Sequence, residues 1–177
     1  GNKLVGKQKF TFYNDTDNSF SNLKFNLFAN AFRKDAKYSP ISAQYSQRAY
    51  YNSESYGDMQ ISRVYDSKGD LAFEICGEDQ NILQVNLTSE IFPEESKTIF
   101  IEYTITLANV IARTGINQKT INLANFYPIL CGISNGAFYE CVYYANGDPY
   151  FSDCANYEIT LTCSNEYVVA SEVELQA

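Results

Sequence analysis

Apolar and polar residues alternate with a period of two along much of the chain. The longest run covers residues 99–107, in which the odd-numbered residues are apolar and Glu102, Thr104 and Thr106 lie between them. Residues 157–163 repeat the pattern, and three shorter runs cover residues 10–12, 71–75 and 83–87. Because successive side chains of a strand point to opposite faces of a sheet, each run predicts a strand with one buried face.

Two other segments carry a less uniform pattern. Residues 20–31 fit a helix through Phe20, Leu23 and Leu27, but they also fit a strand. We favour the strand, because the alternation continues without a break and aromatic residues favour sheets. Residues 42–51 predict one short helix.

Turn-forming residues separate these elements, at residues 14–15, 67–70, 77–79, 93–95 and 146–149. Short strands at this spacing predict an all-β fold, an antiparallel β-sandwich or saddle with at most one short helix. No internal repeat or linker interrupts the pattern, so we expect a single domain over residues 1–177.

Composition excludes several kinds of chemistry. The 177 residues include no histidine, so the chain itself can form neither a Ser-His-Asp triad nor a His-ligated zinc site. The 21 Asp and Glu residues outnumber the 13 Lys and Arg residues, for a net charge of −8. This charge argues against nucleic acid as a partner, since phosphates are bound by basic surfaces. No apolar run approaches the roughly 20 residues of a membrane-spanning helix, and we expect no such segment.

Five cysteines leave two interpretations open. They are Cys76, Cys131, Cys141, Cys154 and Cys163, and no pair has the Cys-x-x-Cys spacing of common metal and redox sites. A disulfide between Cys131 and Cys141 across a turn would suit an oxidising compartment. Alternatively, most of the thiols are small buried apolar groups.

Neither carboxylates nor tyrosines define a site by themselves. The acid pairs Glu94/Glu95 and Asp148/Asp153 lie in predicted turns, where solvated charge is the simpler interpretation, and we expect no catalytic residue. The chain has 15 tyrosines and no tryptophan. Tyrosines exposed on a sandwich could bind carbohydrate or a partner protein. A free-standing secreted β-sandwich that binds through such tyrosines is therefore one functional hypothesis.

The other hypothesis comes from a resemblance. Residues 120–130 (TINLANFYPIL) and 147–160 (GDPYFSDCANYEIT) resemble the end of the N-terminal domain in the aminopeptidase N family, closest to its bacterial, Gram-positive-like branch. Residues 23–32, 79–83 and 167–171 are similar to family segments in the same order. The resemblance thus covers nearly the whole chain.

The family consists of zinc metallopeptidases with a His-Glu-x-x-His motif. The resemblance implies that this chain is a non-catalytic β-sandwich domain that packs on the catalytic domain of the same polypeptide and helps to shape the substrate cleft. Zinc, the His-Glu-x-x-His helix and the Gly-x-Met-Glu-Asn loop would belong to that other domain, and peptide would bind through the parent enzyme. Because relatives are often exported or membrane-tethered, we expect an extracellular or cell-surface location.

The resemblance also nominates site residues. Family members often line the pocket for the substrate's N-terminal residue with a Gln or Glu several residues before the Phe-Pro motif. The corresponding region here makes Gln118 the first substrate-binding candidate and Asn117 the second, although the surrounding sequence departs from the family pattern. An amide oxygen could accept a hydrogen bond from a peptide ammonium. Phe126, Tyr127 and Tyr150 are the candidates for the interdomain interface.

Overall fold

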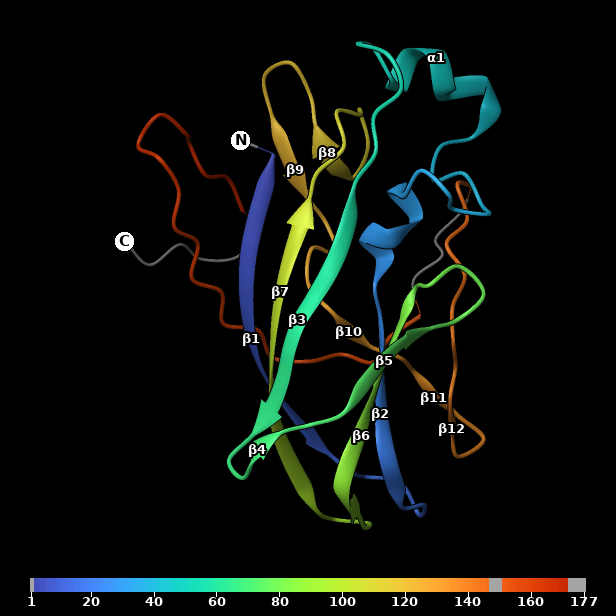
Figure 1. Cartoon of the computed structure of the whole chain (residues 1–177), viewed down its shortest axis with the longest axis vertical. Coiled ribbons are helices and arrows are strands. Elements are labelled where there is room, and N and C mark those ends of the chain that lie inside the picture. The colour runs from blue at the N-terminus through green and yellow to red at the C-terminus, as the bar shows by residue number, and fades with distance from the viewer. Residues whose placement is uncertain (1, 147–150, 172–177) are drawn as a thin grey trace.

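Two four-stranded antiparallel sheets dominate the computed structural model, which describes residues 2–146 and 151–171 (Figure 1). The first sheet has the order β1 (Lys3–Tyr13), β7 (Ser96–Thr106), β3 (Asp58–Asp66) and β4 (Gly69–Asp70). The second has the order β10 (Ile129–Leu130), β2 (Phe20–Asn26), β6 (Ile82–Ile91) and β5 (Phe73–Cys76). The remaining strands of the described residues form two separate two-stranded hairpins. One pairs β8 (Thr114–Ile116) with β9 (Ile121–Leu123), and the other pairs β11 (Ile133–Ser134) with β12 (Ala137–Phe138). The expected all-β, sandwich-like fold is confirmed.

The period-two runs account for the long strands. The run at residues 99–107 forms β7, whose alternate side chains are buried, and β7 pairs with β1 over the full length of both strands. The runs at 10–12, 71–75 and 83–87 fall in β1, β5 and β6, with β5 beginning only at Phe73. In β1, β6 and β7 the apolar positions identify the face that packs inward, whereas in β5 Phe73 packs on the core and Ile75 is 38% exposed.

The core lies between the two sheets. Phe10 on β1 and Phe25 on β2 meet edge to face, with ring centroids 5.0 Å apart. Residues of both sheets form one buried cluster, which includes Leu23, Leu83, Val85, Ile99, Ile101 and Ile105. Burial of this apolar surface is the main force that holds the sheets together.

The strand predicted at residues 20–31 is correct only as far as Asn26. Residues Phe28–Phe32 form a 3-10 helix, η1, whose five side chains are all buried. Asn30 holds this turn in place, because its side chain donates to the carbonyl oxygen of Gln80 and accepts from the backbone N–H of Met59.

The short helix expected at residues 42–51 is present. A 3-10 turn, η2 (Ala43–Tyr45), leads directly into α1 (Ser46–Ala49). Ala49 is buried against Val110, which anchors the helix to the chain that follows β7.

The strand predicted at residues 157–163 is wrong for this structure. Residues 151–171 form no strand, and all their side chains are exposed. The alternation shows which face of the segment could be buried. A strand also needs a hydrogen-bonded neighbouring strand, and residues 157–163 have none among the described residues. Most of the turn predicted at 146–149 lies outside the described residues. No helix in the described part of the chain is long and apolar enough to cross a membrane.

Candidate functional site

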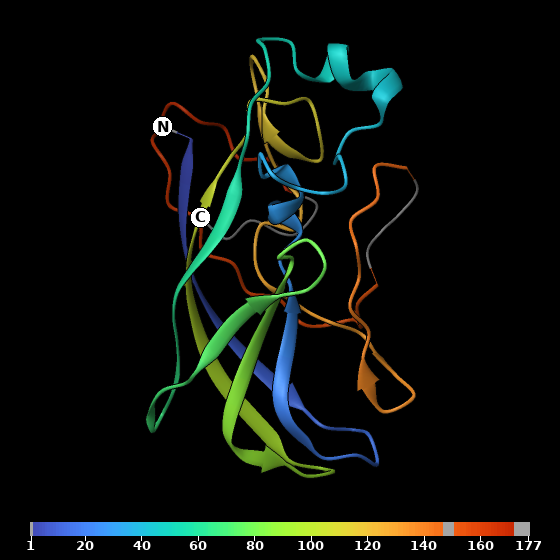
Figure 2. The same cartoon turned by 45° about the vertical axis from the view of Figure 1, so that its right-hand side comes forward.

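Loops from two distant parts of the sequence meet at one end of the molecule, which we call the loop end and define as residues 41–57 and 107–124. Three hydrogen bonds join the two parts: Ile111 N–H to the Ala49 carbonyl, Asn109 N–H to the Ser55 hydroxyl, and the Tyr51 hydroxyl to the Ile116 carbonyl. Figures 1 and 2 both place α1 and the β8–β9 hairpin at this end.

The loop end exposes large apolar side chains. The exposed fraction is 57% for Tyr45, 42% for Tyr56, 44% for Ile111 and 37% for Ile121. Tyr56 and Ile111 lie at or beside the hydrogen bonds that tie the two loop segments together, and Ile121 lies on the β8–β9 hairpin. Tyr45 ends η2. The sequence analysis did not select these residues, because nothing in the local pattern shows that segments about 60 residues apart lie together.

The hairpin β8–β9 carries both substrate-binding candidates at its tip. Gln118 is exposed, and Asn117 is half-buried. The Asn117 side-chain oxygen accepts from the Gln118 backbone N–H at 2.6 Å, and the Asn117 N–H donates to the Thr120 carbonyl at 2.8 Å. Asn117 therefore stabilises the turn, while Gln118 projects from it.

The interface candidates lie elsewhere. Phe126 and Tyr127 touch each other edge to face, with centroids 5.1 Å apart, and both are half-buried against the core. Burial raises the pKa of Tyr127 to about 12, with a smaller contribution from the neighbouring Tyr157. Tyr150 lies outside the described residues.

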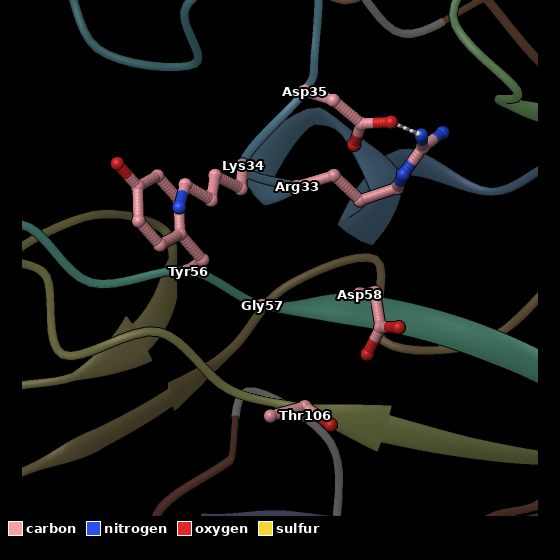
Figure 3. Close-up of a pocket in the computed structure, with 7 residues that line it drawn as sticks. All are labelled: Arg33, Lys34, Asp35, Tyr56, Gly57, Asp58 and Thr106. Carbon is pink, nitrogen blue, oxygen red and sulfur yellow. Dashed lines mark hydrogen bonds and ion pairs between the residues drawn. The ribbon is translucent and has the colours of Figure 1, made fainter.

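A shallow depression of about 250 Å³ adjoins the loop end, where η1, β3 and β7 come together (Figure 3). It is lined by Arg33, Lys34, Asp35, Tyr56, Gly57, Asp58 and Thr106. The lining is polar and carries both signs of charge, so the depression is no apolar ligand cavity.

Two of the four charged side chains in this lining, Arg33 and Asp35, form an ion pair with each other. The Arg33 guanidinium contacts the Asp35 carboxylate at 2.5 Å and also donates to the Asp79 carbonyl. The Asp58 carboxylate accepts from the Gln60 amide at 2.8 Å. A hydrogen bond to Glu54 raises the pKa of Tyr56, so this hydroxyl stays protonated near neutral pH. The depression thus presents a polar surface on which two positive and two negative side chains balance.

The cysteines are free thiols in different environments. Cys131 and Cys141 flank the β11–β12 hairpin and are buried, whereas Cys154 and Cys163 are exposed. Burial raises the pKa of Cys131 to about 12 and that of Cys141 as well, so both are protonated and weakly nucleophilic at neutral pH. The buried-thiol interpretation describes these two, and the alternative, a disulfide between them, is not formed in this structure.

Carboxylates do not gather into a metal or catalytic centre in the described part of the chain. Glu94 and Glu95 stay in the turn after β6, where Glu94 accepts from the Tyr13 hydroxyl and Glu95 from the Phe92 N–H. Asp148 lies outside the described residues. Within residues 2–146 and 151–171, no three Cys, Asp or Glu side chains form a group that could hold a metal ion.

The chain matches no model of a known protein family, and no curated protein or solved structure is significantly similar to it. The kinship with the aminopeptidase N family consequently remains a prediction that rests on the motifs quoted above.

Proposed function

We propose that this chain is a non-catalytic domain of a zinc aminopeptidase-like protein, in which it docks on the catalytic domain and walls part of the substrate cleft. The ordered motifs at residues 23–32, 79–83, 120–130, 147–160 and 167–171 support the family. The absence of histidine agrees with a role in shaping a site rather than in zinc-assisted hydrolysis.

The loop end is the single structural observation that favours this role. It combines exposed aromatic and aliphatic side chains with a hairpin that projects the Gln118 amide. Apolar side chains can anchor an interface, and an amide at its margin can reach a peptide ammonium. The proposal therefore assigns docking to Tyr45, Ile111 and Ile121, and substrate contact to Gln118.

The proposal is tested by association with the partner domain. The chain and the catalytic domain encoded in the same gene are expressed separately and mixed, and binding is measured by calorimetry. Tyr45→Ser should weaken binding about tenfold, as loss of an aromatic interface anchor does. Tyr13→Ser is the matched control, because Tyr13 is 50% exposed but lies on β1. Equal affinities for the parent and both variants would contradict the proposed docking surface.

A carbohydrate screen on the same preparation tests the other hypothesis. The most exposed tyrosines of the described residues are scattered over the fold: Tyr13, Tyr45, Tyr56, Tyr139, Tyr144, Tyr157 and Tyr167. Of these, only Tyr56 lines the depression at the loop end. Glycan binding that is lost with Tyr144→Ser, together with no binding to a catalytic domain, would replace the domain-docking proposal.

A further inference from the structure

β1 is an outer strand with one unused edge. All its residues from Lys3 to Tyr13 pair with β7, so one edge of the strand is satisfied along its whole length. No other strand of the described residues pairs with the opposite edge. An eleven-residue open edge offers a row of free backbone donors and acceptors, which proteins usually cover or protect.

Residues 157–163 have the pattern of a strand but lack a neighbour. Tyr157, Ile159 and Leu161 are 55%, 54% and 43% exposed, and Glu158, Thr160 and Thr162 alternate with them. Exposure of this apolar face is unfavourable, because burying it against a sheet would remove the side chains from water. The segment therefore has an apolar face to bury and backbone groups to pair.

The start of this segment already lies close to the middle of β1. The Tyr157 ring contacts Tyr127, with centroids 5.4 Å apart, and the next residue, Pro128, accepts a hydrogen bond from the Gln8 side chain at 3.1 Å. In both views of the molecule the red trace of residues 151–171 passes on the β1 side (Figures 1 and 2). In Figure 1 it runs toward the end at which β1 begins, opposite to the direction of β1.

The two segments have complementary charges. β1 carries Lys3, Lys7 and Lys9 and no acid, although the chain as a whole is acidic. Residues 151–171 carry Asp153, Glu158 and Glu166 and no Lys or Arg. Opposite charges on facing strands stabilise pairing, and like charges oppose it.

We propose that residues 157–163 dock on the free edge of β1 of the same chain as an additional antiparallel strand, with Tyr157 beside Gln8 and Glu158 opposite Lys7. This register turns the apolar residues of the segment toward the side of β1 that faces the core, and its polar residues toward the side that carries the lysines. The contact with Tyr127 keeps the segment close to β1 of its own chain. Docking within one chain is therefore favoured over docking on a second copy. The described arrangement is then the undocked form. The inference does not depend on the proposed function.

Hydrogen exchange on the full chain tests this docking. If the strand forms, the β1 amides that point away from β7 should exchange slowly, in alternation along the strand. Glu158→Lys should speed their exchange about fivefold or more, because it replaces an attractive cross-strand pair with a repulsive one. Lys7→Glu should do the same, and the double variant Lys7→Glu/Glu158→Lys should restore slow exchange. Lys68→Glu, in an exposed turn away from β1, is the control and should change nothing.

The rescue by the double variant separates docking from other effects. Lys7 also contacts Glu102 at 3.7 Å, so Lys7→Glu alone could act through that pair, whereas Glu158→Lys leaves β1 intact. Fast exchange of the outer β1 amides in the parent chain would overturn the proposal. Slow exchange that appears only at high protein concentration, together with a dimer in light scattering, would overturn it in favour of exchange between copies.

Discussion

Asn26 is fully buried at the end of β2, and neither polar atom of its side chain has a hydrogen-bond partner among the described residues. A buried amide without partners keeps its desolvation cost, so an apolar residue of similar size should be tolerated or favourable. We predict that Asn26→Leu raises the free energy of unfolding by about 1 kcal/mol.

Asn81→Leu is the matched control for this prediction. Asn81 is also buried, but its amide accepts from the Asp79 N–H and donates to the Cys141 carbonyl. Its replacement should lower the free energy of unfolding by about 1–3 kcal/mol, since it leaves those groups unpaired. Denaturant unfolding measures both variants. A loss of stability in Asn26→Leu would show that this amide holds a partner, such as a buried water.

Asp66 should make stability dependent on acid pH. Its carboxylate contacts the Lys97 ammonium at 2.5 Å and accepts from the Lys68 N–H, and these bonds lower its pKa below the ordinary value of 3.8. A carboxyl whose pKa is lower in the folded state stabilises the fold above the unfolded-state pKa, and this stabilisation disappears as the pH falls through the folded-state pKa. Asp66→Asn should therefore be less stable than the parent at pH 7. The gap should narrow steadily below about pH 4. A gap independent of pH would contradict this account of Asp66.

At the scale of elements, the alternation of apolar and polar residues predicted the positions of several strands but not which strands pair with one another. The runs in β1, β6 and β7 were correct because one face of each strand packs into the core between the sheets. The same alternation at 157–163 gave no strand, since pairing depends on a distant edge that the local sequence does not specify. η1 was missed for a similar reason, because Asn30 bends the chain through contacts with residues 59 and 80.

The candidate site likewise contains residues that were nominated before the structure and residues that only the structure reveals. The resemblance nominated Gln118 and Asn117 without placing them in an element, and the structure puts them at a hairpin tip. The proposed docking residues Tyr45 and Ile111 could not be found from sequence, because their segments meet through tertiary hydrogen bonds.

The central strand β7 should dominate stability among the elements. Ile101 is fully buried between the sheets, and we predict that Ile101→Ala lowers the free energy of unfolding by about 2–5 kcal/mol. Ile121→Ala, at a position 37% exposed on β9, should cost about 0.5 kcal/mol or less. Similar losses for both variants in denaturant unfolding would contradict the assignment of the core.

At the scale of the whole molecule, the proposed function predicts that the loop end affects peptide hydrolysis by the parent enzyme. In the proposed parent peptidase, Gln118→Ala should raise KM for an aminoacyl substrate about tenfold while kcat changes little, because the proposed bond to the substrate ammonium would stabilise the ground state and the transition state equally. Lys119→Ala, at the next exposed position of the same hairpin, is the control. Unchanged kinetics for Gln118→Ala would remove this residue from the substrate pocket.

The coding sequence that surrounds this chain tests the central claim most directly. The account predicts that the reading frame continues beyond residue 177 into a His-Glu-x-x-His helix with a downstream zinc-binding Glu. This chain would then be part of a metallopeptidase, and the docking and kinetic experiments would follow in that protein. A stop codon close to Ala177 would contradict the account, because the domain would then act without the catalytic partner that its proposed function requires.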